Sequence, residues 1–257
     1  MIKTQENTNT FVTEDKNTQV SIQQSYLKSK YNFENLIVSQ SNQLAYSVAK
    51  NICDNKEIEY NPFIVIGDSS LGKTHLVQSI KNYVAKNQLV IYISAEQFLN
   101  TYLKHIMQKT MDSFREKYRK CDILIMEDIQ DLANKEGLEE ELFYIIEDLL
   151  TNNKQIILTS NIHPNKIHSL NKRLLGRFVS GLISEIKPFD RATIMEIIKM
   201  KAKMHRVELT SDVIDYIAIS ADSNIYEIKG IVLKIKAYAQ LMHAEIDLAS
   251  VKKLLQY

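Results

Sequence analysis

The sequence predicts an α/β fold, a parallel sheet with helices that is followed by a small all-helical region. Three observations indicate this. Short β-branched runs alternate with segments of helical period, a loop with two glycines joins one run to a helix, and no strand-like run follows Pro188. Because 45% of the 257 residues are apolar, the chain can bury a sizeable core.

Residues 1–30 are rich in Thr, Asn, Gln and Lys and carry few large apolar side chains. Such a segment cannot bury enough surface to offset the entropy of ordering it, so we expect a flexible polar tail. It also lacks the apolar stretch of a secretory signal, and no run in the chain is long enough for a membrane-spanning helix. A cytoplasmic protein without a membrane span is therefore expected.

Five short apolar runs are expected to be buried strands, because each is rich in β-branched residues and too short for a helix. They span residues 63–66, 89–93, 123–126, 155–158 and 182–186. Helices are expected between them, among them 73–86 and 139–150.

After Pro188 three or four helices are expected, at 191–205, 211–220, 225–243 and a short one at the end of the chain. Asp190, Ser211 and Asn224 are expected to cap the first three, because their side-chain oxygens can accept hydrogen bonds from the free N–H groups of a first turn. The chain is thus expected to divide into an α/β domain at 31–187 and a helical domain at 188–257.

Residues 67–74 (GDSSLGKT) fit the phosphate-binding pattern G-x-x-x-x-G-K-[ST], with a strand before them and a helix after them. Backbone N–H groups of such a loop and of the helix N-terminus hold phosphate oxygens. The lysine is expected to meet the β- and γ-phosphates of ATP, and the threonine hydroxyl to join the shell of Mg²⁺. The expected nucleotide-binding residues of this segment are Gly67, Ser70, Gly72, Lys73 and Thr74.

Two further strands end in polar residues that suit a magnesium–nucleotide site. Glu127 and Asp128 follow the apolar run 123–126, and we expect Glu127 to serve the metal and Asp128 the attacking water, although the two roles could be exchanged. The next strand ends in small polar residues that include Asn161, which can contact the γ-phosphate or that water. A polar turn after a strand explains Asn161 equally well.

Charge and cysteine content exclude other classes of function. A net charge of +1 excludes a globally basic nucleic-acid binder and permits only a local basic patch. Cys53 and Cys121 lie far apart without neighbouring ligand residues, so buried reduced thiols are expected, with a disulfide or a metal site as the alternative. The six histidines form no zinc pattern, and metal-site catalysis of that kind is set aside.

The order and spacing of these motifs resemble an AAA+ ATPase, and closely resemble the central domain of the bacterial replication initiator DnaA family. The resemblance runs from about Tyr31 to the end of the chain. Its first stretch, 31–42, is similar to the family's opening helix and loop, which packs on adenine, and this implies that Val38 contacts the nucleotide. The resemblance implies a P-loop AAA+ nucleotide-binding domain at 31–187, a helical lid domain at 188–257, and ATP or ADP with Mg²⁺ as cofactors.

Further residues take their expected roles from the resemblance alone. Residues 96–122 match in length the two-helix insertion that steers these initiators into a filament and borders a channel for single-stranded DNA. The resemblance places Leu103, Lys104 and Lys135 near that DNA, although both lysines also fit an ordinary solvated surface. Residues 171–178 resemble the arginine-finger segment, which implies that Arg177, supported by Arg173, reaches the γ-phosphate of a neighbouring subunit. A surface arginine is the alternative.

The sequence also departs from the family pattern. Asp68 and Ser70 replace loop glycines, where a Cβ restricts positive φ and a carboxylate lies near phosphates, so weaker nucleotide binding is expected. Glu127 replaces an aspartate. Tyr226 replaces the lid arginine that contacts the nucleotide, with Lys229 one turn on as a partial substitute, so slow hydrolysis is expected.

The expected function is initiation of chromosomal DNA replication or its regulation, through nucleotide-dependent assembly with further copies of the chain or with a full-length initiator. We expect no C-terminal helix-turn-helix domain beyond the helical region, and therefore no reading of duplex DNA. The alternatives are a non-catalytic AAA+ adaptor and a helicase-loader-type ATPase. The full-length insertion at 96–122 argues against the loader.

Overall fold

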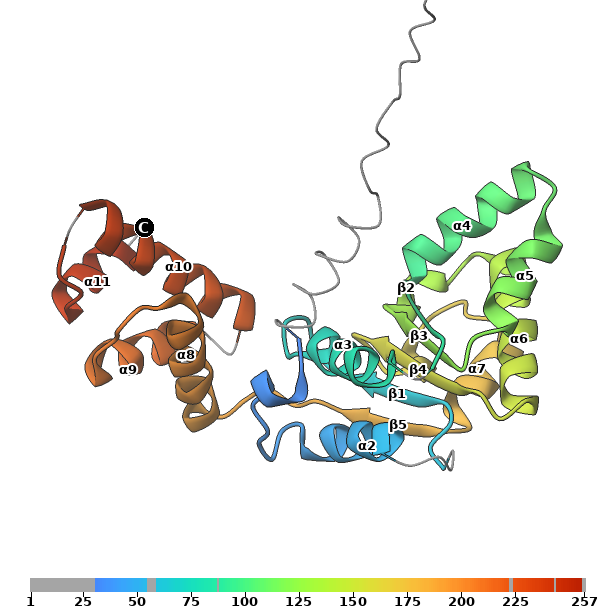
Figure 1. The fold of residues 1–257 in the computed structure, drawn as a ribbon, viewed down its shortest axis with the longest axis horizontal. Helices are drawn as coiled ribbons and strands as arrows, with labels where there is room; N and C mark the ends of the chain where they lie inside the picture. Colours follow the sequence, from blue (N-terminus) through green and yellow to red (C-terminus); the bar gives the residue numbers. More distant parts are fainter. Residues whose placement is uncertain (1–30, 55–58, 87, 222–223, 243, 256–257) are drawn as a thin grey trace, which may run out of the picture. The chain divides into compact units, whose positions relative to one another are not determined.

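The computed structural model describes residues 31–54, 59–86, 88–221, 224–242 and 244–255. The tail expected at 1–30 lies outside these residues. The described residues form one five-stranded parallel sheet with helices, followed along the chain by four more helices (Figure 1). The predicted α/β fold is therefore confirmed.

The strands lie in the order β2-β3-β4-β1-β5, and every neighbouring pair is parallel. All five expected strands are present, and their ends differ from the prediction by at most two residues. Their bounds are Phe63–Ile66 (β1), Val90–Ser94 (β2), Ile123–Glu127 (β3), Gln155–Ser160 (β4) and Leu182–Glu185 (β5).

Helices cover both faces of the sheet, which explains why the central strands are near-continuous apolar runs. On one face, Phe63 and Val65 of β1 pack with α2 (Gln43–Asp54) and α3 (Lys73–Val84). On the other face, Ile64 packs in a second core with four helices. These helices are α4 (Ala95–Met107), α5 (Met111–Arg119), α6 (Glu136–Thr151) and α7 (Lys172–Val179).

The two helices expected within 96–122 are α4 and α5. The side chain of Ser94 accepts a hydrogen bond from the backbone of Gln97, whose side chain in turn accepts from the backbone of Ser94, so a capping box starts α4. The inner side of the pair is aromatic, with Phe98, Phe114 and Tyr118 fully buried and their rings in contact.

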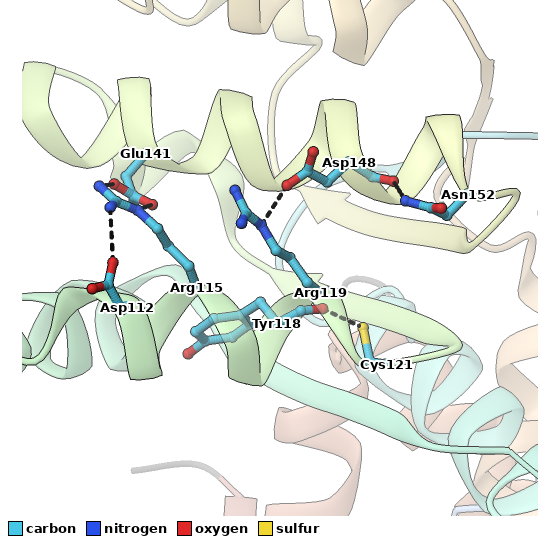
Figure 2. Close-up of polar contacts among 8 residues, drawn as sticks. All are labelled: Asp112, Arg115, Tyr118, Arg119, Cys121, Glu141, Asp148 and Asn152. Atoms are coloured by element: carbon cyan, nitrogen blue, oxygen red, sulfur yellow. Dashed lines mark hydrogen bonds and ion pairs between the residues drawn. The ribbon is translucent and has the colours of Figure 1, made fainter.

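Ion pairs hold α5 against α6 (Figure 2). Arg115 donates two hydrogen bonds to Glu141, of 2.7 and 2.8 Å, and Arg119 pairs with Asp148. The carboxylate of Glu141 is largely buried whereas the guanidinium of Arg115 is partly exposed. A bidentate pair of this kind fixes geometry as well as supplying energy, so it sets how α5 lies along α6.

The C-terminal helices also follow the prediction closely. They are α8 (Arg191–His205), α9 (Ser211–Ser220), α10 (Ile225–Met242) and α11 (Leu248–Leu255). Asp190 accepts a hydrogen bond from the backbone of Thr193, and Asn224 accepts from the first backbone N–H groups of α10, so both expected caps are confirmed. The cap predicted at Ser211 is wrong, because Thr210 holds that position and Ser211 is already helical.

Both cysteines are free thiols, Cys121 buried and Cys53 half-buried. Burial raises the pKa of the Cys53 thiol to about 12 and that of Cys121 to about 11, so both stay protonated and poorly nucleophilic at neutral pH. No helix among the described residues has the length and apolar character needed to cross a membrane.

Replacing Glu141 with alanine is expected to lower the free energy of unfolding by about 1–2 kcal/mol, because Arg115 loses its bidentate partner. Urea unfolding followed by circular dichroism measures the effect. Asp112→Ala is the matched control, because Asp112 is fully exposed and lies 3.5 Å from the same arginine. Asp112→Ala should leave the urea unfolding midpoint unchanged. Equal shifts of this midpoint in the two variants would contradict the role of Glu141 in holding α5 against α6.

Candidate nucleotide-binding site

The strand order brings the three polar motifs to one edge of the sheet. Strands β3, β4 and β1 are adjacent and parallel, so their carboxyl ends meet there. The loop 67–72 leaves β1, Glu127 ends β3, and Ser160 ends β4. The register sets Ile66 beside Ser160, which places the loop and the end of β4 side by side.

The loop depends on two glycines and one strained serine. Gly67 has φ of +153°, and a Cβ there would lie 2.6 Å from the carbonyl oxygen of Ile186. Gly72, the residue before α3, has φ of +94°. Ser70 adopts φ of +71°, a left-handed conformation that costs about 1–2 kcal/mol for a residue with a Cβ.

The structure bears on one premise of the expected weaker nucleotide binding, the backbone angles of the two replaced glycines. Ser70 does adopt the positive φ that its Cβ disfavours, whereas Asp68 does not adopt a positive φ. The side chain of Asp68 consequently strains no backbone angle.

Lys73 lies buried beneath the loop. Its Nζ donates to the carbonyl oxygens of Gly67 at 2.6 Å and Asp68 at 2.9 Å. Burial lowers the pKa of Lys73, and the carboxylates of Asp128, Asp68 and Glu127 oppose that shift. A cation held this way, at the start of a helix, gives the loop the positive charge that an anionic ligand needs.

Thr74 and Glu127 face one another across α3 and β3. The Thr74 hydroxyl donates to Oε2 of Glu127 over 2.5 Å, and the Glu127 side chain is largely buried. Hydroxyl and carboxylate oxygens are the ligands that Mg²⁺ prefers, and this cation takes its remaining ligands from water and phosphate. The donor set therefore fits the metal that the sequence predicts.

Two residues that the sequence analysis did not single out complete this arrangement. Tyr92 of β2 donates its hydroxyl hydrogen to Oε1 of Glu127, and Gln78 of α3 donates to the Tyr92 oxygen over 2.8 Å. Burial, together with Glu127, raises the pKa of Tyr92, so the phenol remains a donor at neutral pH. The sequence signal that could have identified Tyr92 is a tyrosine near the end of β2, the strand that lies beside β3.

The end of β4 is tied to the end of β3 by the amide of Gln130. Its Oε1 accepts from the Ser160 hydroxyl at 3.1 Å and the Asn161 backbone at 3.2 Å, and its Nε2 donates to Asp128 over 3.3 Å. Asp128 has φ of +60°, and its N–H donates to the buried Thr159 hydroxyl. Asp128 and Asn161 are thereby brought to the same edge as the loop, and the Asn161 side chain is exposed.

Arg177 lies on α7 and is paired with Glu147 of α6. Its Nη2 donates to Oε2 of Glu147 over 2.8 Å, and Nε contacts the other carboxylate oxygen. The guanidinium of Arg173 lies over the Phe143 ring, 4.1 Å from its centroid. Both arginines are therefore partnered by α6 within the chain, while about two fifths of the Arg177 side chain remains exposed.

The three residues expected near single-stranded DNA lie in two places. Leu103 and Lys104 are exposed on α4. Lys135 donates to the carbonyl of Asp131 and lines a hollow of about 440 Å³ whose other wall is the start of α4. Glu96 and Leu99 belong to that wall. Lys135 therefore lines the hollow, whereas Leu103 and Lys104 do not.

Residues 31–42, which precede α2, are hydrogen-bonded to α3 at their start. The ring of His75 contacts the Asn32 carbonyl through Nε2 at 3.0 Å, and Asn82 donates to the Tyr31 carbonyl over 2.7 Å. Burial lowers the pKa of His75 to about 4, so the imidazole is neutral at physiological pH. Val38 follows in this segment and is 42% exposed, which leaves its side chain accessible to a ligand.

Tyr226 lies in the first turn of α10 and is 66% exposed. The preceding residue, Ile225, approaches the loop, with its Cδ1 4.0 Å from the position of a Cβ built on Gly72. The start of α10 is therefore close to the loop, and Tyr226, the next residue of that helix, carries no positive charge.

A family profile described as "Bacterial DnaA ATPase domain" matches residues 27–185. The chain belongs to this family. The DnaA initiator of Sulfurimonas denitrificans is 48% identical over 236 residues, which are 91% of this chain and 54% of that relative. The chain thus spans about half the length of the curated DnaA relatives it matches.

Solved DnaA structures share the fold. Domain III of DnaA from Thermotoga maritima superposes with a TM-score of 0.83 at 35% identity, over 88% of this chain and 95% of that one. A DnaA bound to AMPPCP and single-stranded DNA superposes with a TM-score of 0.77 at 37% identity, over 85% and 70% of the two chains. The AAA+ arrangement of sheet and helices is thereby confirmed for this member of the DnaA family.

Gly67→Ala is expected to lower the thermal unfolding midpoint of the ligand-free protein, because the new Cβ meets the backbone of Ile186. Gly230→Ala is the control. Gly230 lies inside α10 with no heavy atom within 4 Å of a built Cβ, so alanine should stabilise the helix by about 0.5–1 kcal/mol. A Gly67→Ala protein as stable as the parent would contradict this account of the loop.

Proposed function

We propose that this chain binds ATP or ADP with Mg²⁺ at the loop 67–74 and acts in the initiation of chromosomal DNA replication or its regulation. The observation that carries the proposal is the buried ammonium of Lys73 beneath the loop, beside the Thr74–Glu127 oxygen pair. The Sulfurimonas relative is named a chromosomal replication initiator, and a DnaA of known structure holds AMPPCP. In this proposal residues 31–187 form the nucleotide domain and 188–257 its lid, in a cytoplasmic protein.

In this proposal each residue of the site has a distinct role. Lys73 exchanges its two carbonyl acceptors for β- and γ-phosphate oxygens, and the N–H groups of the loop and of the start of α3 bind the remaining phosphate oxygens. Thr74 and Glu127 would hold Mg²⁺, which neutralises phosphate charge. Asp128 orients the attacking water and accepts its hydrogen bond, and Asn161 contacts the γ-phosphate or the same water.

Arg177 has a second role in the proposed assembly. We infer that its guanidinium leaves Glu147 and contacts the γ-phosphate held by a neighbouring copy or by a full-length initiator. Turnover by the isolated chain is then slow, because that arginine arrives only from another subunit and Tyr226 supplies no guanidinium of its own. Single-stranded DNA is the proposed nucleic-acid partner, bound along α4 by Leu103 and Lys104 and near the hollow by Lys135, with strong salt dependence.

A non-catalytic AAA+ adaptor is the second candidate. The uncharged, exposed Tyr226 at the start of α10 favours it, because a lid without arginine is poorly suited to stabilise charge on a reacting γ-phosphate. Both candidates bind nucleotide and assemble. They differ in whether assembly raises the rate of ATP hydrolysis.

Lys73→Ala is expected to weaken ATP binding by about 100-fold, because the phosphate tail loses a charged hydrogen-bond donor. Calorimetric titration of the purified protein with ATP and Mg²⁺ measures the affinity. Lys199→Ala is the matched control, since Lys199 is an exposed lysine of α8 that pairs with Glu196. Equal ATP affinity in the Lys73→Ala and control proteins would refute the proposed site.

Arg177→Ala is expected to leave ATP affinity unchanged and to lower the turnover of concentrated, assembled protein by about 10²–10³-fold. The reason is that Arg177 acts on the nucleotide of another subunit. Steady-state phosphate release measured over a range of protein concentrations gives the comparison, with Arg191→Ala of the exposed Arg191–Asp215 pair as the control. Turnover that does not rise with concentration in the parent protein would favour the adaptor.

A further inference from the structure

Both oxygens of the Glu127 carboxylate are engaged from opposite sides. Oε2 accepts from the hydroxyl of Thr74 at the start of α3, and Oε1 accepts from the hydroxyl of Tyr92 on β2. Only 6% of Glu127 is exposed, so water cannot replace either partner freely. A buried carboxylate depends on such partners, because an unsatisfied one costs free energy.

The Tyr92 hydroxyl is itself held in one orientation. Gln78 donates to its oxygen over 2.8 Å, and this leaves the hydroxyl hydrogen to be donated to Glu127. The ammonium of Lys81 lies 4.8 Å from the centroid of the Tyr92 ring, which adds a second restraint from α3. The phenol is thus fixed by α3 on two sides while β2 supplies its backbone.

A glutamate needs this restraint more than an aspartate does. Its carboxylate lies one methylene further from the backbone and turns about one additional single bond, so it has more rotamers to lose when a metal binds. With Oε1 tied to Tyr92, the second oxygen is directed at the Thr74 hydroxyl before any ligand arrives. Outer partners of this kind orient metal-binding carboxylates in other proteins.

We propose that Tyr92, held by Gln78, is a positioning residue for the magnesium carboxylate. Its hydroxyl keeps Glu127 in the conformation in which Oε2 lies beside Thr74, and this contact is what allows a glutamate to serve at the end of β3. The proposal rests on the proposed function, because it assigns a role within that same site. In this role Tyr92 acts through Glu127 rather than by contacting nucleotide or metal itself.

The test is an equilibrium measurement of ATP affinity at a series of Mg²⁺ concentrations and in EDTA, on the full chain. Added Mg²⁺ is expected to raise the affinity for ATP, and the Mg²⁺ concentration that produces half of this increase is the quantity compared. In Tyr92→Phe this concentration is expected to be about 10-fold or more higher than in the parent protein, while the ATP affinity in EDTA stays unchanged. Tyr144→Phe is the matched control, because Tyr144 donates to a carboxylate, Glu140, on an exposed part of α6. It should change neither quantity.

A double-mutant cycle separates positioning from a merely structural role. Glu127→Asp removes the methylene that lets the carboxylate reach Tyr92, so Tyr92→Phe in that background is expected to have no further effect on the Mg²⁺ dependence. Additive effects of the two substitutions would overturn the proposal. A loss of ATP affinity that is equal with Mg²⁺ and with EDTA would also overturn it, because the loop itself would then be disturbed.

Failure of this inference differs from failure of the proposed function. If the parent protein binds ATP more tightly with Mg²⁺ and Tyr92→Phe behaves identically, only the role of Tyr92 falls. If the parent protein binds no ATP in either condition, the proposed function falls and the positioning role falls with it. Gln78→Ala should shift the Mg²⁺ dependence in the same direction as Tyr92→Phe, by a smaller factor.

Discussion

The pairing of β1 with β4 on one side and β5 on the other is the constraint on which the candidate site depends. It brings the loop that follows β1 beside the end of β4, and β3 follows next in the sheet. The chain leaving β5 continues beside the start of the loop, where the Ile186 N–H donates to the Ile66 carbonyl over 2.8 Å. Only a residue without a Cβ fits beside the Ile186 carbonyl, which is why Gly67 is required.

Helix α6 organises the opposite side of the sheet through its acidic residues. The buried Glu139 accepts from the backbone of Asn171, the cap of α7, and Glu147 pairs with Arg177 further along the same helix. Towards α5, Glu141 and Asp148 hold two arginines (Figure 2). Helix α6 therefore holds both α5 of the two-helix insertion and the arginine-bearing α7. It thereby links the part of α7 that we propose for assembly to the core on that side of the sheet.

Much of the fold and part of the site could be predicted from the sequence, because the signals are local. Strand β1 and helices α8 and α9 begin and end where their apolar periodicity and flanking residues predict. The phosphate loop, Lys73 and Thr74 are identifiable because the motif specifies residues that are neighbours along the chain. The cap position predicted at Ser211 was wrong by one residue, since the hydroxyl residue Thr210 precedes it, and the Thr210 side chain makes no capping hydrogen bond.

The sequence by itself determined the α/β class, the loop chemistry and the acidic end of β3, all of which are properties of short contiguous segments. Only the tertiary structure decided that Tyr92, which accepts from Gln78, donates to Glu127, that Gln130 joins the ends of β3 and β4, and that Arg177 is paired with Glu147. These contacts join residues on different elements, up to 35 positions apart for Tyr92 and Glu127. Strand order and register create them, and periodicity along the chain specifies neither.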